Sequence, residues 1–228
     1  MSGPEMLRPL ADLFRGRQLK PTVILLVSTP LLVTWRYVFY HDLWDDPAKG
    51  AVWSFLACFL LLGVVPALIV KFVFRERLAD YGVHWGIPVR TSRSFLMLAP
   101  VFLLAAYVAS GNPAIREEYP VNPTAGSSAA MFGFHALTYV MFYLGWEFYF
   151  RGFMQFGLRE SLGDANALLI QVLASCLLHI GKPGAEVYGA ILGGILWGLL
   201  AYRTRSLLSG LAQHFLLGLA LDWFICFG

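Results

Sequence analysis

Six ionisable side chains stand in the apolar stretches of the sequence, where a charge is costly, and four of them could take part in one reaction. Glu147 and Arg151 lie four residues apart in "GWEFYFRGF", His179 ends "SCLLH", and His214 stands in "LAQHFLLG". A carboxylate beside an imidazole can take a proton from water and return it to a leaving amine. A second imidazole can donate a hydrogen bond to the oxyanion that forms when a peptide carbonyl is attacked. These residue types suffice for peptide-bond hydrolysis, with Arg151 orienting Glu147 from the same helix face.

Two other interpretations of the same residues stay open. A purely structural link between buried helices also explains the Glu147–Arg151 pair, because pairing lowers the cost of burying each charge. Two histidines and a glutamate are also a known catalytic zinc-ligand set, with water in the fourth position. The sequence contains no HExxH motif, and the ligands would come from three separate helices. We therefore expect no cofactor and keep zinc, bound by Glu147, His179 and His214, as the alternative.

The composition indicates the surroundings of these residues. Of 228 residues, 58% are hydrophobic and 14% are charged, and the mean hydropathy is +0.64, far above that of soluble domains. Apolar runs of about 17–25 residues cross a bilayer as helices, because lipid offers the backbone no hydrogen-bond partner. The sequence predicts an all-α polytopic membrane protein, a bundle of about seven transmembrane helices with six to eight as the range. The predicted spans are residues 21–40, 51–74, 95–110, 129–151, 165–181, 185–202 and 206–227, the fourth extending to Leu158 if "FMQFGL" continues it.

Charge asymmetry predicts the domain organisation and the orientation. We assign residues 1–20 to a basic cytoplasmic N-terminal segment and residues 21–228 to a single transmembrane domain. Lys and Arg translocate poorly, and 13 of the 17 fall on the N-terminal side of a seven-span arrangement, against Lys49, Arg116 and Lys182 on the other. We therefore expect the N-terminus in the cytoplasm. This topology also explains the net charge of +3, and we expect no nucleic-acid partner.

Helix geometry predicts that the three candidate catalytic residues lie at similar depths. From a cytoplasmic turn flanked by Arg159 and Asp164, Glu147 lies about 18 Å up one helix and His179 about 22 Å up the next, at 1.5 Å per residue. His214 lies about 14 Å from the same face. All three side chains can therefore meet near the middle of the membrane.

The other polar residues in the spans are interpreted as structural or accessory. His135 lies on a different helix face from Glu147 and is taken as structural. Asp222 is near the outer end of the last span, where it can reach water, and is an accessory candidate. Lys182 and Glu186 follow the "GKPG" break; they either close the outer mouth of the cavity as an ion pair or simply mark a loop.

Small residues in the spans indicate packing. Two GxxxG pairs in the sixth span, Gly189 with Gly193 and Gly194 with Gly198, let a neighbouring helix approach closely. Three cysteines stand inside apolar runs without a disulfide or metal spacing, and we interpret them as packing residues: Cys58, Cys176 and Cys226.

The order of "WEFYFRG", "SCLLH" and "HFLLG" resembles the CPBP family of intramembrane proteases, also called the CAAX protease and bacteriocin-processing, or Abi, family. This family is similar to the type II CAAX prenyl endopeptidase, and its pattern is EExxxR, then FxxxH, then HxxxN or HxxxD on successive helices. The resemblance covers about residues 75–222 and includes "LADYGVHWG" before the core. It implies an intramembrane endopeptidase that cleaves a peptide or membrane-anchored protein in or near the lipid bilayer.

Three positions depart from this pattern. The first Glu is Trp146 here, the Phe of FxxxH is Ser175, and the Asn or Asp of HxxxN is Gly218. In family members with both glutamates, the first activates water together with the second-motif histidine, so this chain lacks the usual base and one oxyanion donor. We expect a one-glutamate variant in which Glu147 and His179 activate water and His214 stabilises the oxyanion.

A rival function follows from the same departures. Trp146 and Gly218 favour a non-catalytic relative, a scaffold or immunity protein that binds a peptide in the same cavity. The combination of a WEF-type first motif with "HIGKP" is similar to a bacterial subgroup of the family. We therefore expect the protein in the bacterial inner membrane.

Overall fold

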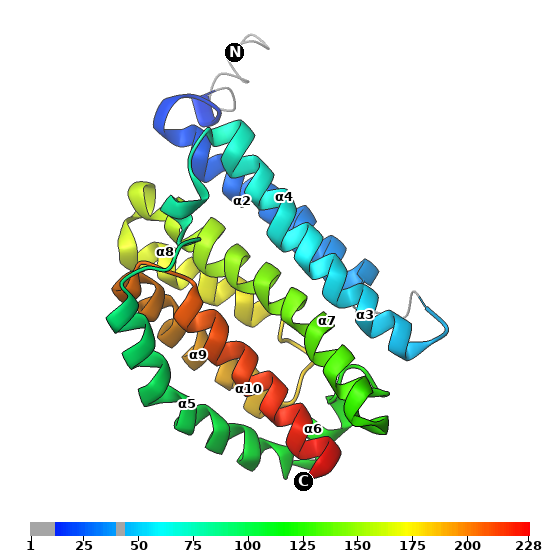
Figure 1. Ribbon diagram of the computed structural model, residues 1–228. Helices are drawn as coiled ribbons and strands as arrows, with labels where there is room; N and C mark the ends of the chain where they lie inside the picture. Colours follow the sequence, from blue (N-terminus) through cyan, green and yellow to red (C-terminus); the bar gives the residue numbers. More distant parts are fainter. Residues whose placement is uncertain (1–11, 40–43) are drawn as a thin grey trace.

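The computed structural model describes residues 12–39 and 44–228, so the first part of the predicted N-terminal segment lies outside the described residues. Within these ranges the chain is a bundle of helices without a strand, which confirms the all-α prediction. The long helices lie alongside one another in Figure 1, and most connections between them are short.

The N-terminal helices form one side of the bundle (Figure 1). The first continues from α-helix into π-helix, and the second is a single rod in which α- and π-helical stretches alternate. Asp46 caps the second rod by accepting hydrogen bonds from the backbone N–H groups of Ala48 and Lys49. The bounds are α2 (Leu19–Thr34) with η2 (Trp35–Phe39), then α3 (Pro47–Cys58), η3 (Phe59–Val64), α4 (Val65–Leu68) and η4 (Ile69–Phe74).

Helix α5 (Pro88–Ser110) lies on the opposite side of the bundle, along α10 (Leu208–Phe227). It begins earlier than the predicted residue 95, because Pro88 fits the first turn of a helix. Its outer face is apolar, with Leu96 70% and Val108 67% exposed. Large apolar side chains on the outside of a bundle whose polar residues lie inside are what a bilayer requires.

The central helices hold the candidate residues. Helix α7 (Ala129–Glu147) passes directly into the π-helical stretch η7 (Phe148–Phe156) and then into α8 (Gly157–Leu177), so the fourth predicted span continues as expected. Gly163 breaks α8 with a φ of 77°, which favours glycine. Arg159 and Asp164 form an ion pair across this break, with an N–O distance of 3.0 Å. Helix α9 (Gly184–Thr204) and α10 complete the bundle.

Five helices of the described chain are long and apolar enough to cross a membrane. These are Gly16–Phe39, Pro47–Phe74, Pro88–Ser110, Gly184–Thr204 and Leu208–Phe227. All seven predicted runs are helical over most of their described length, but the run that contains Glu147 and the run that leads to His179 fall outside these five. The chain is therefore a multi-pass membrane protein.

One of the two predicted GxxxG pairs joins two helices. A Cβ at Gly198 would overlap the side chain of Leu168 on α8. The amide nitrogens of Gln171 and Gln155 donate to the carbonyls of Gly194 and Gly198, at 3.0 and 2.9 Å. The close approach of α9 thus lets buried side-chain amides reach its backbone, and these hydrogen bonds fix α9 against α8 and η7.

The second GxxxG pair does not join helices. A Cβ at Gly189 would meet nothing within 4 Å, and one at Gly193 would meet Trp197 of its own helix. The three cysteines are free thiols, as their positions predicted: Cys58, Cys176 and Cys226.

The segment before α5 fixes the turn between α9 and α10. The Ser206 hydroxyl donates to the His84 carbonyl at 2.5 Å, and the Leu207 N–H donates to the Gly82 carbonyl at 3.0 Å. Gly86 lies so close to this turn that a Cβ would stand 2.6 Å from the Thr204 carbonyl oxygen. These contacts hold the start of α10, from which His214 projects.

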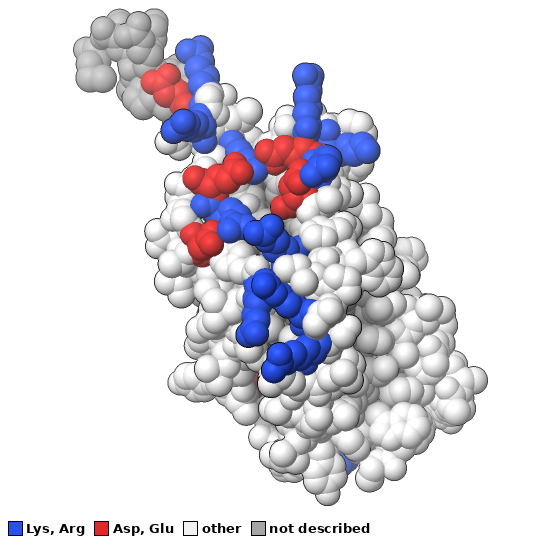
Figure 2. All heavy atoms as spheres, turned by 60° about the vertical axis from the view of Figure 1, so that its left-hand side comes forward, with Lys and Arg blue, Asp and Glu red and all other residues white. Residues whose placement is uncertain are grey.

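Basic side chains gather toward one end of the bundle. Figure 2 shows Lys and Arg over the upper part of one face, with Asp and Glu among them, while the lower part is almost uncharged. The beginning of α5 and the end of α9 meet at this end, where Arg90 donates to the Arg203 carbonyl at 3.3 Å. Arg151 lies inside the bundle and is 1% exposed. Counting it among the 13 basic residues on the N-terminal side of the membrane is therefore wrong.

Candidate active site

Glu147 stands where α7 changes from α-helix to the π-helical stretch η7. One of its carboxylate oxygens, Oε1, accepts a hydrogen bond from Nδ1 of His214 at 2.8 Å. The same oxygen lies 3.2 Å from Nη1 of Arg151 in an ion pair that lacks hydrogen-bond alignment. The side chains of Glu147 and Arg151 are each 2% exposed. The structure therefore brings together three of the four residues singled out from the sequence.

Two aromatic rings fix the His214 imidazole. The Trp197 ring stacks on it, with centroids 3.9 Å apart and an interplanar angle of 25°. The Tyr143 ring meets it edge-on at 4.7 Å and 70°. With its Nδ1 held by Glu147, the imidazole has one defined orientation.

His179 lies in the turn that follows α8. Its Nδ1 donates to the carbonyl of Ser175 at 2.8 Å. The Trp146 ring stands edge-on to the imidazole, with centroids 5.7 Å apart. Trp146 occupies the motif position of the first family glutamate, so an aromatic ring packs on His179 where the family pattern has a carboxylate.

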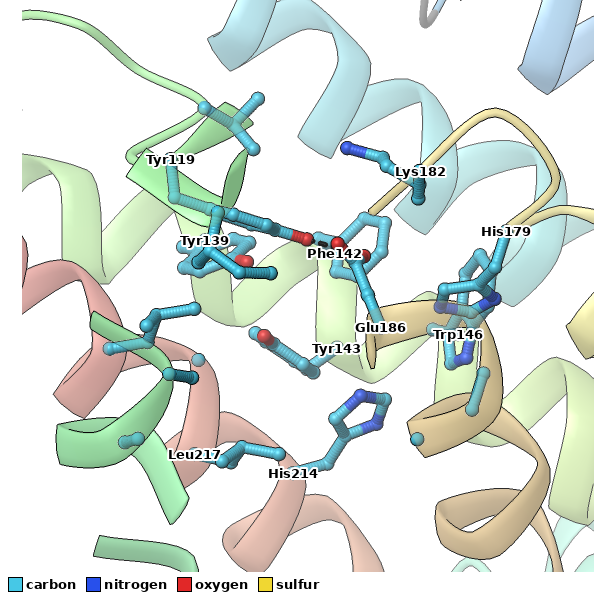
Figure 3. Close-up of a pocket in the computed structure, with 18 of the residues that line it drawn as sticks. Tyr119, Tyr139, Phe142, Tyr143, Trp146, His179, Lys182, Glu186, His214 and Leu217 are labelled. Carbon is cyan, nitrogen blue, oxygen red and sulfur yellow. Dashed lines mark hydrogen bonds between the residues drawn. The ribbon is translucent and has the colours of Figure 1, made fainter. Parts of the chain in front are cut away.

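His179 and His214 line one cavity of about 520 Å³. Figure 3 shows the two imidazoles reaching it from different elements, with Trp146 and Tyr143 beside them. The walls are mostly aromatic and aliphatic, as in binding sites for apolar or extended ligands. Among the described residues that line this cavity, Glu147 is absent, because it lies behind His214.

The hydrogen bonds assign the state of both imidazoles. A backbone carbonyl and an ionised carboxylate can only accept, so Nδ1 carries the proton in both rings. In neutral imidazoles Nε2 is then an acceptor in His179 and in His214. This geometry differs from the expected division of roles. Glu147 partners His214 rather than His179, and a neutral His214 offers the cavity a base rather than a hydrogen-bond donor.

Two accessory candidates also line the cavity, each with a partner from the segment that follows α5. Lys182 forms an ion pair with Glu118 at 2.5 Å, Glu118 being the last residue of α6 (Pro113–Glu118). Glu186 accepts a hydrogen bond from the Tyr119 hydroxyl at 2.7 Å. Glu186 is the one carboxylate among the described residues of the cavity wall, and Figure 3 shows it facing the same space as His179.

The third accessory candidate, Asp222, is placed differently from the expectation. It is fully buried and lies 2.8 Å from Nε2 of His135, which is equally buried. Asp222 therefore does not reach water. Asp222 is the partner of His135, whose structural role stays a prediction.

The alternative zinc set lacks the required arrangement. In residues 12–39 and 44–228, no three His, Cys, Asp or Glu side chains are grouped closely enough to hold a metal ion. Glu147 lies behind the imidazole of His214 and already accepts its Nδ1–H. The set Glu147, His179 and His214 therefore does not fit a zinc ion in this structure.

Comparison with known protein families gives a match to part of the chain. Residues 128–220 match the family model described as type II CAAX prenyl endopeptidase Rce1-like. This segment, here called the CPBP segment, is similar to the CAAX-protease (CPBP) family. It runs from the residue that caps α7 into α10 and contains Glu147, His179 and His214. The CPBP family is a protease family, so the match supports a peptidase activity in general.

The CPBP segment covers less than half of the chain and is shorter than the predicted 75–222. The comparisons with curated proteins and with solved structures give no match.

Two residues of the site escaped the sequence analysis. Tyr143 lies one helical turn before Glu147, and an i,i+4 search from the carboxylate would have found it. Trp197 lies one turn after Gly193, but nothing in the sequence indicates that it stacks on His214.

Proposed function

We propose that this protein is an intramembrane endopeptidase that hydrolyses a peptide bond in a membrane-associated protein or peptide. The proposal depends on one observation above all: the Glu147–His214 hydrogen bond of 2.8 Å stands at the wall of a cavity that also exposes His179. A carboxylate that holds an imidazole by Nδ1–H leaves Nε2 as a base, which is the arrangement of a hydrolytic dyad. The similarity of residues 128–220 to a protease family supports the same reaction.

In the proposed reaction, water attacks the peptide carbonyl carbon while Nε2 of His214 takes one of its protons. Nε2 of His179 accepts a hydrogen bond from the other water hydrogen and so orients the attacking oxygen. The His214 imidazolium, stabilised by Glu147, then gives its proton to the leaving amine as the C–N bond breaks. Glu147 stays ionised throughout, held by Arg151. The expected water activation by Glu147 with His179 is thereby revised.

The proposed reaction uses no metal. Within the same cavity, Glu186 is an alternative to His214 as the general base. As a carboxylate on the cavity wall, Glu186 could accept the water proton directly. The two assignments differ in one test, because Glu186→Gln removes the base in the rival scheme and leaves the Glu147–His214 pair intact.

The experiment uses the full-length protein in lipid nanodiscs. An internally quenched farnesylated peptide with a CAAX terminus, the same peptide without farnesyl, and a peptide library read by mass spectrometry serve as probes. We expect cleavage by the wild type and its loss in His179→Ala and His214→Ala. His84→Ala, a histidine outside the cavity, is the matched control and should cleave at the wild-type rate. Full turnover in either cavity variant would overturn the proposal.

A second function is favoured by Trp146, whose ring takes the place of a carboxylate beside His179. A scaffold or immunity protein would bind a peptide in the cavity without cutting it. In that case the wild type binds the probes and releases no fragment from any of them.

We also propose that the protein resides in the bacterial inner membrane with its N-terminus in the cytoplasm. The gathering of Lys and Arg at one end of the bundle supports this orientation (Figure 2). Protease treatment of spheroplasts should leave an N-terminal epitope tag intact; removal of the tag would reverse the assigned orientation.

A further inference from the structure

We propose that the hydroxyl of Tyr143 is the oxyanion donor of this site, in the space that a side chain at position 218 would otherwise fill. The inference rests on the peptidase function proposed above and adds a catalytic residue to it. It begins from what the two histidines cannot do. Both use Nδ1–H for a fixed partner, so a neutral ring offers the substrate only an acceptor at Nε2.

A peptidase needs a donor for the oxygen that becomes negative when water adds to the carbonyl. Trp146 and Trp197 line the cavity and carry indole N–H groups, but both indole nitrogens are buried and have no accessible surface to offer a substrate. Lys182 and Tyr119 also line the cavity, and each already has a partner, Glu118 and Glu186 respectively. Tyr143 is the hydroxyl that stands beside the base.

Tyr143 is placed for this role by its neighbour on α10. Its ring lies edge-on to His214, with centroids 4.7 Å apart, and it lines the same cavity. The two side chains reach the cavity from α7 and α10 and lie on the same side of it (Figure 3). A carbonyl attacked by water at Nε2 of His214 is therefore within reach of the Tyr143 hydroxyl.

Gly218 makes this position available. A Cβ at Gly218 would overlap the Tyr143 hydroxyl oxygen and would stand 2.9 Å from Cζ of the same ring. Every other amino acid at 218 would thus displace the hydroxyl from its place. In the family pattern this position, four residues after the histidine, holds Asn or Asp. The Tyr143 hydroxyl fills the space that a side chain at position 218 would need, so the chain can have one or the other there but not both.

The proposed step is a hydrogen bond and no covalent change. The Tyr143 O–H donates to the carbonyl oxygen as it gains charge, and the hydroxyl keeps its proton when the C–N bond breaks. Such a donor acts on the transition state more than on the bound substrate. Its removal should therefore lower kcat and leave KM nearly unchanged.

The first test replaces Tyr143 with Phe in the full-length protein in nanodiscs, using whichever probe the wild type cleaves. We expect kcat to fall by about 10²–10³-fold, the usual effect of losing one oxyanion donor. Tyr149→Phe is the matched control, because Tyr149 is equally buried on the same helical rod and does not line the cavity. It should keep the wild-type kcat. A Tyr143→Phe variant with wild-type kcat would overturn the inference.

A second readout separates a donor from a merely structural tyrosine. A peptidyl phosphonate mimics the tetrahedral oxyanion, so Tyr143→Phe should weaken its binding by the same factor as it lowers kcat/KM, while KM stays constant. Equal weakening of the phosphonate and the substrate would contradict the donor role. Cleavage by the wild-type protein is established first. Failure of the Tyr143 inference is therefore distinguishable from failure of the peptidase proposal.

Position 218 supplies the converse test. Gly218→Ala should displace the hydroxyl and lower kcat to the level of Tyr143→Phe. The double variant Tyr143→Ala with Gly218→Asn restores the family's donor in a space now free of the ring, and should recover at least tenfold over Tyr143→Ala. Wild-type turnover in Gly218→Ala would contradict the inference that the oxyanion donor lies in this space. So would a double variant that folds as well as Tyr143→Ala and recovers no activity.

Discussion

Removing the charge of Glu147 should damage folding and catalysis together. Glu147→Gln keeps the side chain's shape and leaves Arg151, whose side chain is 2% exposed, without its carboxylate. Breaking one partner of a buried ion pair costs about 3–5 kcal/mol. At about 2–4 °C per kcal/mol for a chain of this length, the Tm should fall by roughly 6–20 °C. Loss of activity in this variant alone would therefore say little about chemistry.

A double variant separates the two effects. Glu147→Gln with Arg151→Met removes both charges from the bundle interior, and replacing a buried pair by neutral side chains is often neutral or stabilising. The Tm of this double variant should therefore be close to that of the wild type. Catalysis should not return, because a neutral amide no longer fixes the proton on Nδ1 of His214. Loss of the corresponding carboxylate in a Ser-His-Asp triad lowers kcat by about 10⁴-fold, and we expect a loss of this order here.

The assay pairs thermal unfolding in detergent micelles with kcat/KM on a cleavable probe. Arg151→Met alone is the control, because it leaves the opposite charge buried and should be destabilised to a similar degree. If Glu147→Gln unfolds at the wild-type temperature, the reasoning from buried charge is wrong. If the double variant regains turnover along with stability, Glu147 is a structural partner of Arg151 and not part of the catalytic machinery.

Further predictions concern the other parts of the site and the bundle. His179→Ala should lower kcat by about 10²–10⁴-fold with little change in Tm, and a wild-type kcat would remove His179 from the reaction. Gly198→Ala places a methyl group against α8 and should lower the free energy of unfolding by about 1–3 kcal/mol. Gly189→Ala adds a methyl group in open space and should not destabilise the protein. Equal Tm values in the two variants would contradict the packing described for α9. Asp222→Ala should cost about 1–3 kcal/mol because it leaves a buried imidazole nitrogen unpartnered, and an unchanged Tm would show that the His135 pair contributes nothing. Incubation with 1,10-phenanthroline should leave turnover unchanged, and inhibition reversed by Zn²⁺ would restore the zinc alternative.

The fold could be predicted from the sequence because each transmembrane helix is determined by the composition of its own segment. An apolar run must satisfy its own backbone in lipid, so its length and composition alone predict a helix, as for 185–202 and the observed Gly184–Thr204. Helix ends that are set by proline or by side-chain contacts do not follow from length and composition, and α5 begins at Pro88 rather than near residue 95. The passage from α-helix to π-helix after Glu147 has no signature in composition or periodicity.

The site was accessible only in part, because it depends on how each helix is rotated about its axis. Depth along the membrane follows from counting residues, and this brought Glu147 to the level of His214. Counting does not say which face of α10 turns toward α7, so the burial of Asp222 and the partner of Glu147 could not be read from the sequence. The tautomers of the histidines likewise depend on partners that only the coordinates supply.

Two polar pairs set the rotation and register of α7 against α10. His135 pairs with Asp222 and Glu147 pairs with His214, each at 2.8 Å, so the two antiparallel helices are joined at two points along their length. Apolar side chains alone fix such a register poorly in a bilayer, because lipid tails solvate them as well as another helix does, whereas side-chain hydrogen bonds between helices resist sliding.

Tyr143 lies between the two pairs, one turn from Glu147, and Gly218 lies one turn from His214 and one turn from Asp222. Fixing the pairs therefore fixes the tyrosine hydroxyl against the glycine, because the contact lies inside the span that the pairs enclose. On this argument the His135–Asp222 pair, which is not among the residues that line the cavity, is part of what places the oxyanion donor, although it never touches the substrate.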